Sequence, residues 1–294
     1  MSEINGIYAA SVSILNENLK LDISKTIKHA ENLINQGCHG VAIFGSTGQA
    51  QLISYNEKIN LITKLSKSKF KEKFIIGTGL NSLIDTISLI NLCKSFNFNK
   101  FLVMPPAYYM YGDKDVKIFF KKLLEAVNDC KIILYNFEKL CGYKFSIECV
   151  ETLAKDFPEQ IIGVKDSSYN LYEHLKIPGF SILPGSELKL LKGLEIGCSG
   201  IITATCNVTA NLSRKVYDDF KKSIPQTVND KLCNVRLAFD KYNLISCMHS
   251  YLGENDSCYK NILPPCSLLN ISDKNKLFDN LKKLNFENNF LKVA

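Results

Sequence analysis

Eight short apolar runs, rich in β-branched residues, divide the chain into units of similar length. Their starts lie roughly 20 to 35 residues apart, which is the length of a strand followed by a crossover helix. Most of the runs are apolar throughout rather than alternating, as is typical of parallel strands that are covered on both faces. The expected strands are residues 6–12, 40–44, 74–77, 101–104, 132–135, 161–165, 182–184 and 200–203.

Helical patterns fill the gaps between these runs. Residues 23–36 carry apolar side chains at helical spacing, residues 82–96 begin with a capping-box pattern, and residues 146–157 end before Pro158. Eight strand–helix units predict a (β/α)8 TIM barrel over residues 1–224, with a doubly wound open sheet as the alternative. After Thr203 the strand signal fades, so we expect a C-terminal helical region over residues 225–294.

Composition excludes several classes of protein. The 294 residues carry a formal net charge of +7, but the lysines are scattered and do not alternate with aromatic residues, so we expect no nucleic-acid partner. No apolar run reaches the ~18 residues that a membrane-spanning helix needs, and no apolar leader follows the first residues. We therefore expect a cytoplasmic protein without a membrane contact.

The cysteines and histidines do not form a metal-binding pattern. The chain has eleven cysteines but no C-x-x-C pair, which predicts reduced and mostly buried thiols. The four histidines are far apart and lack the spacing of zinc ligands, so each is expected to be a surface residue or a hydrogen-bonded structural residue; they are His29, His39, His174 and His249. We expect neither a metal nor an organic cofactor.

Catalytic residues of a barrel lie where its strands end, so the polar residues after each run are the candidates. Lys165 closes the sixth run, an unusual place for a lysine because a buried ammonium group is costly without a partner. Burial favours the neutral amine, which can attack a carbonyl and form an imine. The structural alternative is a lysine that reaches solvent or pairs with Asp166.

Three further strand ends carry polar or aromatic residues. Tyr135 ends the fifth run, where a phenol can transfer a proton during imine formation or simply pack under the loops. Residues 45–49 (Gly-Ser-Thr-Gly-Gln) form a turn that can present N–H groups to a carboxylate, or an ordinary strand–helix turn with a polar cap. Three tyrosines follow the fourth run in a proline-rich loop, which suits a binding surface or an oligomer contact.

Together these segments resemble the dihydrodipicolinate synthase / N-acetylneuraminate lyase family. The matching segments are Gly-Ser-Thr-Gly at 45–48, Gly-Thr-Gly-Leu-Asn at 77–81, Pro-Ala-Tyr-Tyr at 106–109, Tyr-Asn at 135–136 and Gly-Val-Lys-Asp at 163–166. The resemblance extends over the whole chain. It implies a class I, Schiff-base aldolase or carbon–carbon lyase that handles pyruvate or a related 2-oxo acid together with an aldehyde, and a homotetramer built as a dimer of dimers.

The resemblance implies a catalytic role for four residues. Lys165 matches the lysine that forms the imine, while Tyr135 and Ser46 match the groups that relay protons to and from the substrate. Tyr109 matches the tyrosine that is offered to this relay across a subunit contact, with Tyr108 as the less favoured choice. For substrate binding, the resemblance implies Thr47 and Gly48 at the carboxylate and Ile202 as an apolar wall of the imine pocket.

The sequence also departs from the family pattern. Synthases that condense pyruvate with aspartate semialdehyde have an arginine five residues after the relay tyrosine, and Leu140 stands there, beside Lys139. Lysine is a point charge without the bidentate fork of arginine. Gln49 replaces the usual Glu, and Glu138 replaces a usual proline. We therefore expect an N-acetylneuraminate lyase-like or 2-keto-3-deoxy sugar acid aldolase-like enzyme; the alternatives are the lysine-biosynthesis synthase and a non-catalytic sensor of 2-oxo or sugar acids.

Overall fold

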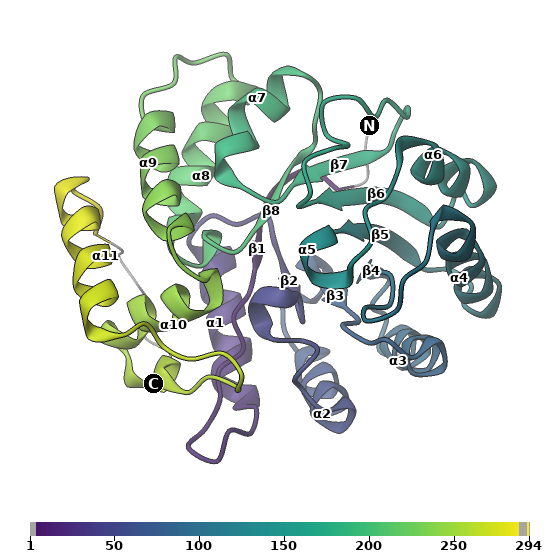
Figure 1. Cartoon of the computed structure of the whole chain (residues 1–294), viewed down its shortest axis with the longest axis horizontal. Coiled ribbons are helices and arrows are strands. Elements are labelled where there is room, and N and C mark those ends of the chain that lie inside the picture. The colour runs from purple at the N-terminus through teal and green to yellow at the C-terminus, as the bar shows by residue number, and fades with distance from the viewer. Residues whose placement is uncertain (1–3, 288–292, 294) are drawn as a thin grey trace.

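The computed structural model describes residues 4–287 and residue 293, and the described chain forms a parallel eight-stranded sheet rolled into a barrel (Figure 1). Each strand from β1 to β6 pairs with the next one along the chain, and β8 pairs with β1. The strands are β1 Gly6–Ala10, β2 Gly40–Ile43, β3 Phe74–Gly77, β4 Lys100–Val103, β5 Lys131–Asn136, β6 Ile161–Asp166, β7 Ser181–Pro184 and β8 Gly200–Thr203. The predicted (β/α)8 barrel is confirmed.

The alternative of an open doubly wound sheet is wrong, because β7 and β8 meet and nearly close the barrel. At this seam the Ser199 N–H donates to the Ile182 carbonyl over 2.9 Å, although no regular ladder joins the two strands. The first strand ends at Ala10 rather than at residue 12. There the chain leaves the sheet, because the Val12 N–H donates to the Asn207 side chain instead of to a strand.

Helices surround the barrel and continue beyond it on one side (Figure 1). Side-chain caps begin several of them: Asp22, Ser82 and Ser146 each accept a backbone N–H of the first turn, and Ser54 forms a full capping box with Glu57. The helices are α1 Ile23–Asn35, α2 Tyr55–Leu65, α3 Leu83–Ser95, α4 Asp113–Ala126, α5 Glu138–Cys141, α6 Ile147–Asp156, α7 Leu190–Glu195, α8 Cys206–Lys221, α9 Asn229–Asp240, α10 Leu244–Asn255 and α11 Ile271–Lys283. Residues 167–180 connect β6 to β7 without a helix.

Helices α9, α10 and α11 form the predicted C-terminal helical region, which lies against the start of the barrel (Figure 1). A second apolar cluster joins residues of these helices to Val12, Ile14 and Val208. The segment before α11 is tied to the barrel as well, because the Gln49 side chain donates to the Leu263 carbonyl over 2.9 Å and accepts from its N–H over 3.0 Å. The division of the chain at residue 224 stays a prediction, and residues 1–3, 288–292 and 294 lie outside the described residues.

The described residues contain cysteines without disulfides and no cluster of metal-binding side chains. The eleven cysteines are free thiols, and eight of them are buried. No group of three or more His, Cys, Asp or Glu side chains in that part of the chain is placed to hold a metal ion. None of the helices there is long and apolar enough to cross a bilayer.

A buried histidine, His29, joins the C-terminal region to the barrel through hydrogen bonds, and a second one, His249, makes a hydrogen bond within that region. His29 of α1 contacts the Asn207 side chain over 2.8 Å and the Tyr259 hydroxyl over 2.9 Å. His249 of α10 contacts the Tyr259 carbonyl over 2.7 Å. Burial, with a smaller contribution from the nearby His249, lowers the pKa of His29 to about 4.

This histidine predicts a loss of stability in mild acid. The folded-state pKa lies below the unfolded value of about 6.5, so the contribution of His29 is complete above that pH and is lost as the pH falls toward 4. We expect His29 to cost about 2 kcal/mol of unfolding free energy between pH 7.5 and pH 5. Urea unfolding at both pH values measures it.

The controls for this prediction are two histidine variants. His29→Gln removes the titration, so its stability should change less between the two pH values than that of the parent protein. His174→Gln changes an exposed histidine and should keep the parent's pH dependence. Equal pH dependence in all three proteins would contradict the assignment to His29.

Candidate active site

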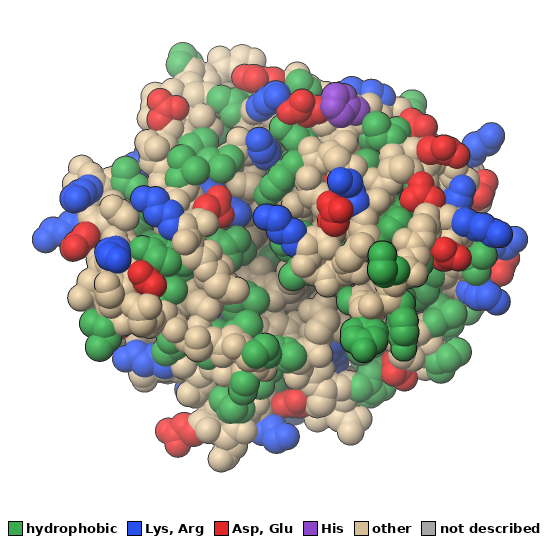
Figure 2. Space-filling model, in the orientation of Figure 1, with side chains coloured by type: hydrophobic (Ala, Val, Ile, Leu, Met, Phe, Trp, Pro, Cys, Tyr) green, Lys and Arg blue, Asp and Glu red, His purple; other side chains and the backbone are tan. Residues whose placement is uncertain are grey.

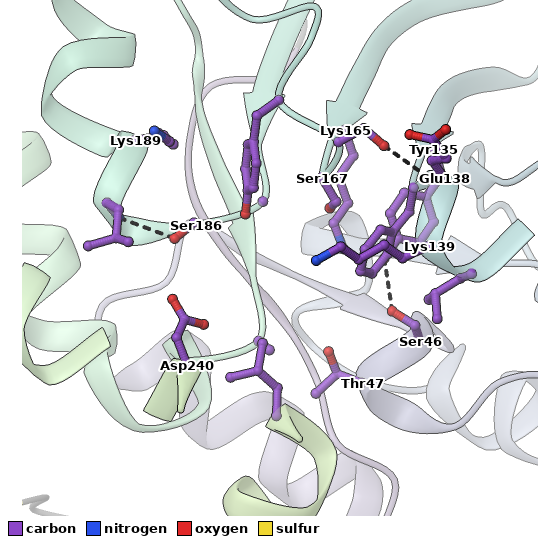
Figure 3. Close-up of a pocket in the computed structure, with 18 of the residues that line it drawn as sticks. Ser46, Thr47, Tyr135, Glu138, Lys139, Lys165, Ser167, Ser186, Lys189 and Asp240 are labelled. Atoms are coloured by element: carbon purple, nitrogen blue, oxygen red, sulfur yellow. Dashed lines mark hydrogen bonds between the residues drawn. The ribbon is translucent and has the colours of Figure 1, made fainter. Parts of the chain in front are cut away.

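A cavity of about 660 Å³ opens at the carboxyl ends of the barrel strands, and Figure 2 shows it as a hollow near the middle of this face. Its walls come from the ends of β5, β6 and β7, from the turn after β2, and from the start of the C-terminal region. Many of the residues that line the cavity are polar or charged, and Figure 3 labels several of them. These include Ser46, Thr47, Tyr135, Lys139, Lys165, Ser167, Lys189 and Asp240.

Lys165 is the penultimate residue of β6 and lines this cavity. Its side chain is only 3% exposed, and it pairs in register with Tyr135 of β5. The Nζ atom lies 4.2 Å from the centroid of the Tyr135 ring. The amine is therefore held in a mostly dry place beside a phenol, rather than reaching into solvent.

Asp166 does not serve as the counter-ion of Lys165. Its carboxylate accepts hydrogen bonds from the Asn136 side chain and from the backbone N–H groups of Tyr169, Leu171 and Tyr172. These bonds hold the helix-free segment after β6 against β5. The structural alternative of a Lys165–Asp166 pair is therefore wrong, and no ion pair to Lys165 is found among the described residues.

The turn after β2 brings a hydroxyl to Tyr135. The Ser46 Oγ and the Tyr135 hydroxyl lie 2.8 Å apart, and either can be the donor (Figure 3). Phe44 gives the chain its direction here with a φ of 58°, a left-handed conformation that is strained for a bulky residue. Residues 46–48 then form a short 3-10 helix, which places Thr47 in the cavity wall.

The structure brings together four of the predicted site residues, namely Ser46, Thr47, Tyr135 and Lys165. Gly48 does not line the cavity: its N–H donates to the Gly45 carbonyl and its own carbonyl accepts from the Ser13 hydroxyl. Ile202 is buried in β8 outside the lining. Tyr109 is 73% exposed and lies away from this cavity, as does its neighbour Tyr108.

The sequence interpretation missed several cavity residues, among them Ser186, Lys189, Asp240 and Arg236 of α9. Arg236 is buried and donates through Nη1 to Glu187 over 2.9 Å and through Nε to Asp240 over 2.8 Å. Glu187 also accepts bonds from the hydroxyls of Thr203, Thr205 and Thr209, so its charge is fully hydrogen-bonded behind the cavity wall. No local motif signals this arginine, because a helix distant in sequence carries it back to the barrel.

Known proteins resemble this chain in sequence and in fold. A model of the dihydrodipicolinate synthetase family matches residues 3–284. The chain belongs to the dihydrodipicolinate synthetase family. A DapA-like lyase of Chloroflexus aurantiacus is 28% identical over 228 residues, 75% of this chain and 76% of the relative. The 4-hydroxy-tetrahydrodipicolinate synthase of Lactobacillus acidophilus is 28% identical over 218 residues, 72% of this chain and 69% of that one.

Solved structures share the fold. YagE, a prophage protein of E. coli K12 crystallised in complex with pyruvate, superposes with a TM-score of 0.88 at 22% identity, over 97% of this chain and all of that one. Dihydrodipicolinate synthase of Aquifex aeolicus gives 0.89 at 20% identity, over 98% of this chain and all of its own. Members of the dihydrodipicolinate synthetase family are Schiff-base lyases of the aldolase type, and this chain is a class I aldolase or lyase of that family.

Proposed function

We propose that Lys165 forms a Schiff base with pyruvate or a related 2-oxo acid, and that the enzyme cleaves a 2-keto acid to an aldehyde or makes it in reverse. The observation that carries this proposal is the buried Lys165 amine beside Tyr135, whose hydroxyl lies 2.8 Å from Ser46 Oγ. The relative YagE, which binds pyruvate in its crystal structure, supports a 2-oxo acid as the substrate.

The proposed steps follow from the positions of these groups. The carboxylate of the 2-oxo acid binds at the Ser46–Thr47 turn, and the Lys165 amine attacks the C2 carbonyl. Tyr135 and Ser46 pass protons to the departing oxygen, which leaves as water. The C4 hydroxyl next gives its proton to this relay while the electrons of the C3–C4 bond move to the iminium, and an aldehyde leaves. The enamine takes a proton back at C3, and water then hydrolyses the imine to release pyruvate and the free amine.

The experiment that tests this step is trapping with borohydride. Pyruvate and borohydride together should add one reduced pyruvate to the protein, and peptide mass spectrometry should place it on Lys165. Borohydride alone is the control. A protein that gains no mass, or gains it at a different lysine, contradicts the proposed mechanism.

We further propose a homotetramer in which Tyr109 of one subunit completes the relay of another. Tyr108, Tyr109 and Met110 are strongly exposed apolar side chains in the loop before α4, and a patch of this kind favours a protein contact. Asn81 supports this loop, since its side chain accepts the Ala107 N–H over 2.9 Å. Within one chain Tyr109 is exposed and is not among the residues that line the cavity around Lys165, which agrees with a role across an interface.

For the second substrate we propose a hydroxylated aldehyde with an anionic end, as from a 2-keto-3-deoxy sugar acid that carries a second acidic group, a carboxylate or a phosphate, at its far end. Ser167, Ser168 and Ser186 supply hydroxyl groups along the cavity, while Lys139 and Lys189 line it without an ion pair among the described residues. Leu140, also in the lining, provides no cation. Arg236 is already engaged by two carboxylates, which makes it a weak replacement for a free guanidinium.

We expect Lys189→Gln to raise the KM for a 2-keto acid with an anionic end about 5- to 10-fold, because one favourable charge contact is lost. The KM for an otherwise similar 2-keto acid whose far end is uncharged should not change. Pyruvate trapping on Lys165 should also be unaffected. Lys192→Gln, which removes a lysine paired with Glu173 outside the cavity, is the matched control. Equal effects on both substrates would contradict the proposed contact.

Assays on the parent protein also test two alternative functions. The lysine-biosynthesis synthase requires condensation of pyruvate with aspartate semialdehyde, which a coupled reductase assay measures. The non-catalytic sensor requires binding without turnover, and pyruvate release from a panel of 2-keto acids decides against it. Retention of Lys165, Tyr135 and Ser46 in one cavity favours an enzyme over a sensor.

A further inference from the structure

Lys58 of α2 is a second buried lysine that the proposed mechanism does not use. Its side chain has 0% exposure, and its Nζ atom donates to the Thr78 carbonyl over 2.7 Å and to the Gly79 carbonyl over 3.1 Å. No carboxylate among the described residues forms an ion pair with it. Burial lowers the pKa of Lys58 to about 8, and no charged neighbour offsets this.

The surroundings of this amine connect it to the turn that carries Ser46. The Nζ atom lies 5.8 Å from the ring centroid of Phe44, within reach of a cation–π contact. Phe44 is the left-handed residue that sets the direction of the turn. Its carbonyl is packed on Gly77, where an added Cβ would lie 2.3 Å from the Phe44 oxygen. The ammonium group therefore lies where the loop after β3 meets the turn after β2.

The same loop is fitted closely to both sides of this contact. Gly79 has a φ of +55°, and a Cβ there would lie 2.4 Å from the Ala50 Cβ and 3.2 Å from Lys58 Nζ. Two residues further on, Asn81 holds the Ala107 N–H of the loop that carries Tyr109. One buried cation thus connects the segments on which Ser46 and Tyr109 are placed.

We infer that Lys58 is a positioning residue that fixes the Phe44–Ala50 turn, and through it the Ser46 hydroxyl, in the geometry that the proton relay needs. Burying an ammonium group costs free energy unless the group is fully hydrogen-bonded. An apolar side chain of similar volume would therefore fill this place at a lower cost in stability. Charge-assisted bonds to two carbonyls hold a loop more firmly than apolar contacts do. The consequence for catalysis rests on the proposed function, whereas the consequence for the turn does not.

The test compares three variants: Lys58→Met, which keeps the length and removes the charge and the donors; Lys58→Gln, which keeps a donor; and Lys64→Gln, an exposed control on the same helix. We expect Lys58→Met to slow imine formation with pyruvate about 10- to 100-fold per folded molecule, with a smaller change in KM. Lys58→Gln should recover part of this rate, and Lys64→Gln should match the parent protein.

Amide hydrogen exchange in the absence of substrate separates this inference from the proposed function. Exchange at residues 46–50 should accelerate in Lys58→Met and not in Lys64→Gln, whatever the enzyme turns over. A merely stabilising role would lower the melting temperature of Lys58→Met and leave both the imine rate of the folded protein and the exchange of this turn unchanged, which would overturn the inference. If Lys58→Met does not fold, equal exchange and equal rates in Lys58→Gln and the parent would overturn it. Failure of the parent protein to trap pyruvate would instead count against the proposed function alone.

Discussion

Replacing Lys165 with methionine is expected to abolish turnover, with kcat at least about 10⁴-fold below that of the parent enzyme. Methionine fills nearly the same volume, so the cavity at the carboxyl ends of the strands should persist while the nucleophile is lost. Without an amine at this place no imine forms and no electron sink is available for the bond at C3. Pyruvate release from a 2-keto acid, measured by a coupled assay, gives the rate.

Controls separate the loss of the nucleophile from a general disturbance of the site. Tyr135→Phe and Ser46→Ala keep the amine but remove a relay hydroxyl, so each should lower kcat about 10²- to 10³-fold and still allow slow trapping of pyruvate on Lys165. Lys100→Met changes a lysine at the opposite end of the barrel and should behave as the parent protein does. Substantial turnover or borohydride labelling in Lys165→Met would show that another residue forms the imine.

The largest effect on stability is expected from Arg236→Met. This change leaves the fully buried Glu187 carboxylate without its cation, since Nη1 of Arg236 lies 2.9 Å from Glu187 Oε2. Removing one partner of a buried pair costs about 3 to 5 kcal/mol, because the remaining charge is neither solvated nor paired. Urea unfolding at pH 7.5 measures the loss.

A double variant and a second arginine test the cause of that loss. Glu187→Gln with Arg236→Met removes both charges, and it should be more stable than Arg236→Met alone. Arg214→Met breaks a partly exposed pair with Asp218 and should cost no more than about 1 kcal/mol. If Arg236→Met were as mild as Arg214→Met, Glu187 would have to be accommodated without its buried partner.

The sequence predicts the barrel well because most of the buried strands are apolar along most of their length. For the same reason it predicts the centre of the cavity: Lys165 and Tyr135 interrupt such runs at their last residues, and adjacent parallel strands bring their ends together. The end of β1 lies two residues earlier than the sequence predicts, since Val12 is apolar like the strand before it while a side chain of α8 takes its N–H.

Other parts of the site depend on contacts that no local pattern records. Arg236 reaches the cavity only because α9 packs back against the barrel and Glu187 holds its guanidinium. Gly48 matches the family motif, yet its backbone groups are used within the turn itself. Gln49 reads as a minor departure from that motif, and its purpose is visible only when the Leu263 backbone is placed beside it. An amide both donates and accepts there, which a carboxylate could not do.

The pair formed by Gln49 and Leu263 has a consequence for how a newly made polypeptide acquires its activity. These two residues are 214 positions apart, so the ribosome has synthesised most of the chain before Leu263 is available to bind Gln49. A nascent chain that ends before Leu263 contains all eight described strands of the barrel but lacks the two hydrogen bonds that hold Gln49, which follows the Ser46–Thr47 turn. We therefore expect catalytic activity to appear late in translation, when the final helices have been made, rather than gradually as the strands leave the ribosome.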